Sequence, residues 1–225
     1  MSSIFNAHYC AAIRLAQLST RRSLPSIIDC TVTLDESRRR PYRLRQRADR
    51  QDATRRRIVQ ATVDLHRTVG PARTTISAVA ELAGVQRHTV YRHFPDEATL
   101  FKACAAHFLA DHPPPDTRRW AEIGDPQVRL QSGLFELYSF YGANEEMIAS
   151  VLRDSAVKPV GGGFRALQAA AFDALATVRP AGRGGKAFRA ALRLATDFRA
   201  WQALGPTDRS PAAAARLMSR LLNCA

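Results

Sequence analysis

The 225-residue chain has little lysine, few acidic residues and no long apolar run. Only three of its 33 basic residues are lysines, and 20 acidic residues leave a net charge of +13. No run of roughly 18 apolar residues occurs, so we expect no transmembrane helix. The acidic residues are scattered, which argues against the carboxylate cluster that a metal-dependent DNA-processing enzyme needs.

Cysteine is also scarce, and its spacing indicates neither disulfides nor a metal site. Cys104, His107 and Asp111 could share one helix face, but two turns of one helix supply few ligands, so we predict no metal. The first twenty residues lack the basic start of a secretory signal. We expect free thiols in a cytoplasmic protein at Cys10, Cys30, Cys104 and Cys224.

Catalytic and cofactor motifs are missing as well. Residues 182–187 resemble a phosphate-binding loop, but Pro180 stands where its first glycine belongs, and Ala187 replaces the serine or threonine that holds magnesium. We expect a flexible loop there. Without a nucleophile elbow, a metalloprotease motif or paired carboxylates, the sequence predicts neither an enzyme nor a cofactor.

Arginine is concentrated near the N-terminus. Ten arginines lie between Arg38 and Arg57, against two acids, Asp49 and Asp52. Such a run either contacts phosphates and a minor groove or is a disordered solubilising segment, and the sequence leaves both interpretations open. We predict a disordered basic extension over residues 1–50, of which residues 1–45 are either native or the result of a start codon assigned too far upstream.

The most informative segment runs from Ile76 to Phe94. Thr74 or Thr75 can cap its first helix, and Gly84 stands where the chain must turn, because glycine tolerates a left-handed conformation. Val90 and Phe94 point inward from a second helix. The segment predicts a helix-turn-helix over residues 75–94. The apolar face of the first helix is formed by Ile76, Val79, Ala80 and Ala83.

The second helix carries polar side chains that suit DNA. Arginine can bind guanine O6 and N7, a threonine methyl can meet a thymine methyl, and tyrosine and histidine can donate to phosphates. A solvated surface helix is the competing interpretation. The predicted DNA-binding residues are Thr75, Gln86, Arg87, His88, Thr89, Tyr91, Arg92 and His93.

Two flanking helices extend this motif. The first, over residues 54–68, ends at Gly70-Pro71, and the second starts after Pro95-Asp96-Glu97 and stops before the prolines at 113–115. Ile58, Ala61, Thr62 and Leu65 form one face of the first helix, and the apolar positions of the second are Leu100, Phe101, Cys104 and Phe108.

Residues 55–112 resemble the DNA-binding domain of the tetracycline-repressor (TetR) family. The resemblance implies that residues 86–93 are the recognition helix. The family usually has a lysine near the start of the fourth helix, where this chain has Glu97, so neighbouring arginines would have to make that phosphate contact. The matching residues are Gly70, Thr74-Thr75-Ile76, Val79-Ala80, Ala83-Gly84-Val85, Thr89 to Phe94, and Leu100.

Residues 116–225 have the spacing of a helical bundle. Apolar positions predict helices near 126–141, 147–152, 164–175, 188–201 and 217–222. The resemblance implies a regulatory domain that binds a small-molecule effector, with a homodimer interface formed by its last two helices, about 185–203 and 210–222.

Aromatic residues of this bundle are candidates for the effector pocket, because such pockets are mostly apolar. Plain core packing is the competing role, and the commoner one at this spacing. Arg153 and Asp154 could orient a polar ligand, but we expect them to end a helix in water. The candidate pocket residues are Tyr138, Phe140, Tyr141, Met147, Phe164, Phe172, Phe188 and Trp201.

These patterns predict an all-α protein. A three-helix helix-turn-helix domain over residues 51–112 would lead through a connector helix into an antiparallel bundle over residues 116–225. The expected function is that of a dimeric repressor that an effector releases from a palindromic operator in double-stranded DNA, with no membrane partner. A non-specific architectural DNA-binding protein and a DNA-processing enzyme are the alternatives.

Overall fold

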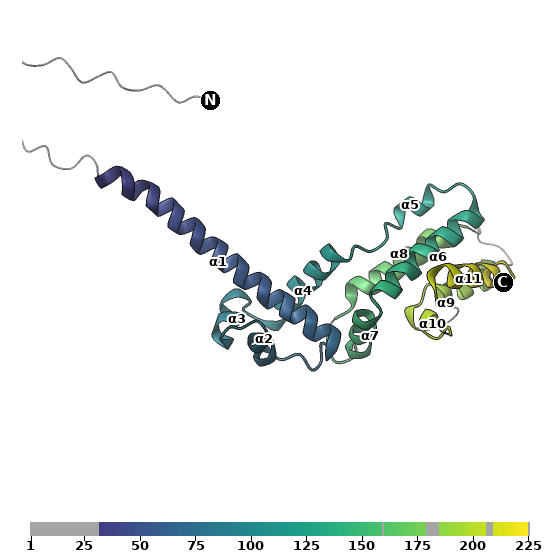
Figure 1. Ribbon diagram of the computed structural model, residues 1–225. Helices are drawn as coiled ribbons and strands as arrows, with labels where there is room; N and C mark the ends of the chain where they lie inside the picture. Colours follow the sequence, from purple (N-terminus) through teal and green to yellow (C-terminus); the bar gives the residue numbers. More distant parts are fainter. Residues whose placement is uncertain (1–31, 159, 179–184, 206–208, 225) are drawn as a thin grey trace, which may run out of the picture. The chain divides into compact units, whose positions relative to one another are not determined.

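Helices joined by turns and loops make up the part of the chain that the structure describes, as the sequence predicts (Figure 1). This computed structural model describes residues 32–158, 160–178, 185–205 and 209–224, and no strand occurs in those ranges. Residues 48–225 form one compact unit, and residues 1–47 are set apart as another. No helix in the described ranges is long and apolar enough to cross a membrane.

The first helix, α1 (Val32–Thr68), begins well before the predicted residue 54. The predicted disordered extension is therefore helical from Val32, whereas residues 1–31 lie outside the described residues. Arginine, glutamine and alanine favour helix, and Pro41 is the only proline or glycine between Val32 and Thr68. An arginine-rich segment that would stay disordered by itself can therefore extend a helix whose C-terminal half is fixed by packing.

Three short elements pack against the C-terminal half of α1. They are α2 (Ile76–Leu82), α3 (Arg87–His93) and α4 (Glu97–Asp111). Their shared core contains the predicted apolar residues of α1, α2 and α3, together with Leu100 and Phe101 of α4, whereas Cys104 and Phe108 belong to another cluster. Its buried members are Ile58, Val59, Ala61, Val79, Ala80, Ala83, Val90, Phe94 and Leu100.

Caps and one glycine fix the ends of these helices. The Thr75 hydroxyl oxygen accepts the Ala78 N–H at 3.2 Å, and the Asp96 carboxylate accepts the Thr99 N–H at 2.6 Å. Gly84 has a φ of +64° between α2 and α3, which is the left-handed turn that its sequence position predicts. Thr74 is instead buried, and its hydroxyl donates to the Gly70 carbonyl oxygen at 2.9 Å.

The rest of the chain forms a second, larger core. Helices α6, α8, α9 and α11 run side by side in it (Figure 1). Trp120 and Trp201, the only tryptophans, are both buried there. The helices are α5 (Arg118–Ala121), α6 (Pro126–Ala143), α7 (Glu145–Asp154), α8 (Gly162–Ala176), α9 (Gly185–Ala195), α10 (Phe198–Gln202) and α11 (Pro211–Cys224).

Two details of the second half differ from the prediction. The helix predicted over 188–201 is broken, because Asp197 is extended and its carboxylate accepts the Arg199 and Ala200 N–H groups as the cap of a new helix, α10. The single turn of α5 was not predicted. It carries Trp120, whose indole N–H donates to Glu136 at 2.8 Å.

A small apolar cluster joins the two cores. Val63 from α1, Cys104 from α4 and Met147 from α7 are buried together, with Phe108 and Val151 packed against them. The helix-turn-helix part and the bundle are therefore in direct contact through α1, α4 and α7.

Candidate functional site

Helix α3 presents a polar surface to solvent. Val90 is fully buried on one side of it, so the remaining side chains are turned outward. Tyr91 is 46% exposed. Exposed side chains are Gln86, Arg87, His88, Tyr91 and Arg92, and half-buried ones are Thr89 and His93.

Arg55, from α1, holds the end of this polar helix. Its guanidinium donates to the His93 carbonyl oxygen at 3.0 Å and stacks 4.2 Å from the centre of the Phe94 ring. Burial, helped by the neighbouring Arg92 and Arg55 charges, lowers the pKa of His93. One member of the arginine run therefore positions α3, and His93 is less accessible than the sequence predicts.

Glu97, the residue that departs from the TetR pattern, has a partner that the sequence did not reveal. Its carboxylate forms an ion pair with Lys158, which follows α7. Lys158 also lies 5.7 Å from the centre of the Phe101 ring. The acidic group at the start of α4 thus faces a lysine of the bundle.

An apolar cavity of about 360 Å³ lies beside these elements. Its walls come from the end of α1, from α4, α6 and α7, and from the glycine-rich start of α8. The lining includes the aromatic rings of Phe101, Phe108, Phe140 and Phe164. Of the predicted pocket residues, Phe140, Met147 and Phe164 line this cavity.

The other five predicted pocket residues are core residues. The Tyr138 hydroxyl donates to the Ala195 carbonyl oxygen at 2.7 Å, and the Tyr141 hydroxyl donates to that of Thr196 at 2.6 Å. Burial raises the pKa of both phenols well above the usual value. These rings pack among other aromatics and do not line the cavity. All five are buried: Tyr138, Tyr141, Phe172, Phe188 and Trp201.

His66 is the buried polar residue of the cavity wall. Its Nδ1 lies 3.5 Å from the Cys104 Sγ, and its ring meets Phe101 edge to face with centroids 4.4 Å apart. Burial lowers the pKa of His66 to about 4 and raises the pKa of Cys104 to about 12. Both groups are therefore neutral near pH 7.

Comparison with known proteins identifies the first part of the chain. Residues 58–104 match the family model "Bacterial regulatory proteins, tetR family". This part of the chain is a TetR-type DNA-binding domain. The matched range begins at Ile58, a buried residue of α1, and ends at Cys104, so it contains the helix-turn-helix described above.

Two curated relatives are similar to part of the chain. The chain is 37% identical over 71 residues to the HTH-type transcriptional regulator TtgR of a Pseudomonas putida strain. It is equally similar to the probable HTH-type transcriptional regulator ArpR of Pseudomonas putida. Each match covers 31% of this chain and 34% of the relative, so the chain spans about a third of the length of these relatives.

Two solved structures share the fold over most of the chain. A TetR-like transcriptional regulator from a Rhodococcus species has a TM-score of 0.53 at 18% identity, covering 75% of this chain and 93% of that one. A TetR transcription regulator from Haloarcula marismortui has a TM-score of 0.52 at 19% identity, covering 77% and 98%. The bundle is thus TetR-like in fold as well.

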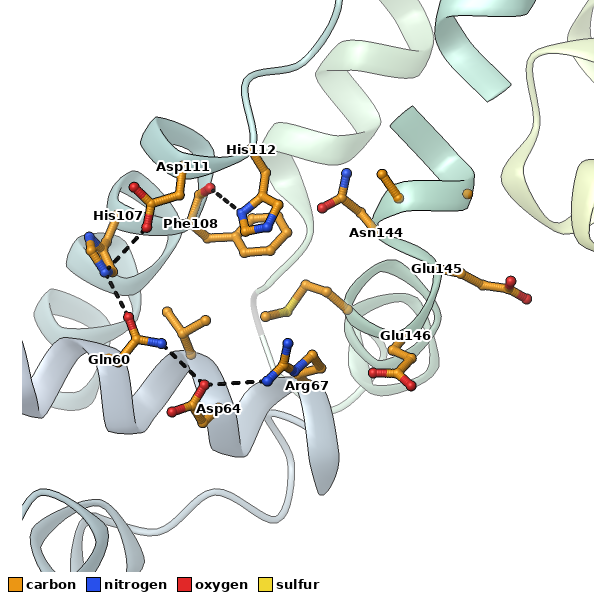
Figure 2. Close-up of a pocket in the computed structure, with 14 residues that line it drawn as sticks. Gln60, Asp64, Arg67, His107, Phe108, Asp111, His112, Asn144, Glu145 and Glu146 are labelled. Carbon is orange, nitrogen blue, oxygen red and sulfur yellow. Dashed lines mark hydrogen bonds and ion pairs between the residues drawn. The ribbon is translucent and has the colours of Figure 1, made fainter. Parts of the chain in front are cut away.

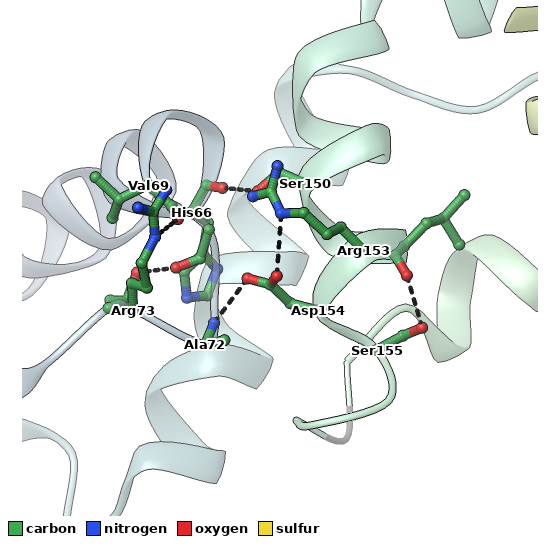
Figure 3. A network of polar contacts seen from close by, with 11 residues as sticks. His66, Val69, Ala72, Arg73, Ser150, Arg153, Asp154 and Ser155 are labelled. Carbon is green, nitrogen blue, oxygen red and sulfur yellow. Dashed lines mark hydrogen bonds and ion pairs between the residues drawn. The ribbon is translucent and has the colours of Figure 1, made fainter.

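A polar network ties the TetR-type domain to α7 (Figure 3). The Ser150 hydroxyl donates to the His66 carbonyl oxygen at 2.6 Å, and the Asp154 carboxylate accepts the Ala72 N–H at 2.9 Å. Arg153 donates to Asp154 at 3.2 Å. Arg153 and Asp154 were expected to end a helix in water, but Asp154 is buried and holds the turn between α1 and α2.

A second cavity, of about 400 Å³, is polar (Figure 2). The His107 Nε2 lies 3.0 Å from the Gln60 Oε1 and 3.7 Å from the Asp111 Oδ2. The Cys104 thiol instead contacts His66. The three residues weighed as metal ligands are thus not brought together, and the described residues contain no group of three ligands suited to a metal. Residues 182–184 of the weighed phosphate loop lie outside the described residues, and Gly185 begins α9.

Proposed function

We propose that this protein is a dimeric transcriptional regulator of the TetR family, which acts in the cytoplasm and releases a palindromic operator when a small molecule occupies the apolar cavity. The observation that carries the proposal is the outward polar face of α3, opposite the buried Val90, in a domain that matches the TetR model. Both curated relatives are named transcriptional regulators.

DNA recognition rests on α3. The exposed Arg87 can bind a guanine bidentately, while His88, Tyr91 and Arg92 donate to bases or phosphates. Arg56 and Arg57, exposed on α1, supply salt-dependent affinity without sequence preference.

Dimerisation would use α9 and α11, which contact each other. Leu194 is 66% exposed on α9, and Leu221 is 55% exposed on α11. Large apolar side chains on two adjacent helices are suited to burial against a second copy. A dimer would hold two α3 helices for two half-sites about one turn of DNA apart.

Release would follow from the position of the cavity. Its walls include α1 and α4 of the DNA-binding domain and α7 of the bundle, so a ligand contacts both parts. If these helices have one arrangement that binds DNA and another that does not, a ligand that binds the second more tightly weakens DNA binding. The free energy of this coupling equals the difference between the ligand's binding free energies to the two arrangements. A coupling of about 1–3 kcal/mol corresponds to roughly 5–150-fold.

Fluorescence anisotropy tests DNA recognition. Purified protein is titrated into the DNA upstream of its own gene and into operators selected from random sequence, with excess random competitor at physiological salt. We expect tight binding to a palindrome that survives the competitor. Binding that the competitor abolishes on every selected sequence would indicate a non-specific architectural protein, and metal-dependent cleavage of the DNA would indicate an enzyme.

Three arginine variants separate recognition of bases from non-specific electrostatic attraction to DNA. Arg87→Ala should reduce discrimination between the palindrome and random DNA, with a loss of about 1–3 kcal/mol at the base it contacts. Arg57→Ala should weaken binding to both DNAs alike. Arg119→Ala, on exposed α5, removes the same charge far from α3 in sequence and should change neither. Equal effects of Arg87→Ala on both DNAs would contradict the assignment.

A further inference from the structure

One ring nitrogen in the wall of the apolar cavity has no hydrogen-bond partner. His66 is only 5% exposed, and its Nε2 has no partner among the described residues. A buried polar atom without a partner is costly, so native proteins keep few of them. His66 lines the cavity, so a ligand bound there can supply the missing partner.

The neighbour of His66 determines what Nε2 can offer. The Cys104 thiol, 3.5 Å from Nδ1, keeps its proton because burial disfavours the thiolate. An imidazole lone pair accepts hydrogen bonds far better than a thiol sulfur does, so the S–H donates to Nδ1. The neutral ring then carries its own hydrogen on Nε2, which is a donor.

The rest of the cavity restricts the ligand further. The four phenylalanine rings, with Met147 and Leu167, give an apolar lining suited to flat rings. Lys102 lines the cavity, but its side chain is exposed to solvent, and Lys158, which lies over the Phe101 ring, is paired with Glu97. A volume of about 360 Å³ lies at the lower end of the range for small-molecule sites.

We infer that the cavity binds an uncharged, aromatic or polycyclic molecule carrying a carbonyl or similar acceptor, and that the His66 Nε2–H donates to this acceptor. The ligand class follows from the cavity alone, and its effect on DNA rests on the proposed function. The His66 backbone carbonyl oxygen accepts a hydrogen bond from the Ser150 hydroxyl. The residue that donates to the ligand therefore also belongs to the network that joins α1 to α7.

A matched pair of probes tests this inference. 9-Fluorenone and fluorene have the same ring skeleton and differ in one carbonyl group. Binding of each to the full-length protein without DNA is followed by ligand-detected NMR. We expect saturable binding of fluorenone about tenfold tighter than that of fluorene, the value of one net hydrogen bond to a buried donor. Equal affinities, or no saturable binding of either probe, would overturn the inference.

Histidine variants locate the donor. His66→Phe should abolish the preference for fluorenone while keeping fluorene binding, because the ring shape remains and the donor is lost. His107→Phe is the matched control, since His107 lines the polar cavity and not the apolar one, and the preference should persist. A preference that survives His66→Phe would assign the donor to another residue.

A measurement on the unchanged protein guards against misfolding of the variant. In protein labelled with ¹⁵N-histidine, fluorenone should shift the Nε2 resonance of His66, and fluorene should shift it much less. No change at His66 on saturation with fluorenone would overturn the assignment.

The two proposals fail separately. Fluorenone binding that leaves operator affinity unchanged would retain the ligand site and reject release by this ligand class. Operator binding with no fluorenone binding would retain the DNA-binding function and reject the site.

Discussion

Gly70 lies against the bundle, beside Ser150, Arg153 and Asp154 of α7. Its φ is +93°, and a Cβ there would collide with the Asp154 carboxylate and lie 2.7 Å from the Arg153 guanidinium. We expect Gly70→Ala to lower the free energy of unfolding by about 2–4 kcal/mol, since backbone strain and a steric clash add. Urea denaturation measures this loss.

Gly84→Ala is the control for backbone strain alone. Gly84 has a φ of +64°, but no atom lies within 4 Å of a Cβ built on it. We expect a loss of about 1–2 kcal/mol there. If Gly70→Ala lowers the free energy of unfolding no more than Gly84→Ala does, the close approach of Gly70 to Asp154 does not add to the effect of backbone strain.

His66 also makes folding sensitive to acid. Its folded pKa of about 4 lies below the ordinary 6.5, so between these values the unfolded chain binds a proton that the folded chain does not. Stability attributable to His66 is complete above about pH 6.5 and falls by up to about 3 kcal/mol as the pH drops to 4. Denaturation at several pH values should show this fall, and His66→Phe should lack it.

At the scale of residues, spacing predicted which side chains of α3 face outward but not what buried polar groups contact. Arg87 and Tyr91 are exposed because Val90 and Phe94 are inward, which follows from helical period alone. His66 has its partner 38 residues away at Cys104, and Tyr138 has its partner 57 residues away at Ala195. Such partners depend on how helices pack, so spacing alone could not separate aromatic residues of the core from those that line the cavity.

Among elements, α3 depends on α1 for its position. Arg55→Ala removes the hydrogen bond to the His93 carbonyl oxygen and the stacking on Phe94. We expect a loss of about 1–2 kcal/mol in local stability, seen as faster hydrogen exchange of α3 amides. Arg57→Ala, two residues along the same helix, should leave this exchange unchanged. Equal protection in both variants would show that α3 is held without Arg55.

The predicted helix ends agree with the structure where a capping residue or a glycine lies at the end of the helix. Thr75, Gly84 and Asp96 fix α2, α3 and α4 close to the predicted positions. The extension of α1 to Val32 was missed because the dense arginine run was interpreted as a disordered segment. The break before α10 was missed because Phe188, Leu192, Ala195 and Trp201 keep helical spacing across it, although Asp197 could have been recognised as a cap.

At the scale of the whole molecule, Asp154 links two cores. It accepts the Ala72 N–H across the boundary, beside the small cluster of Val63, Cys104 and Met147. We expect wild-type residues 48–225 to unfold in one calorimetric transition and Asp154→Ala to separate it into two, because the variant leaves the Ala72 N–H unpaired. Asp116→Ala, which breaks an exposed ion pair with Arg118, should keep one transition. A single transition in Asp154→Ala would mean that the apolar cluster suffices to link the cores.

Both tryptophans lie in the larger core, and neither lies between residues 48 and 112. Intrinsic tryptophan emission therefore reports on the bundle alone, and the DNA-binding domain can lose its structure without changing that signal. Far-ultraviolet circular dichroism sees every helix. Tryptophan emission and circular dichroism, recorded on one sample during denaturation, would show whether the DNA-binding domain or the bundle unfolds first.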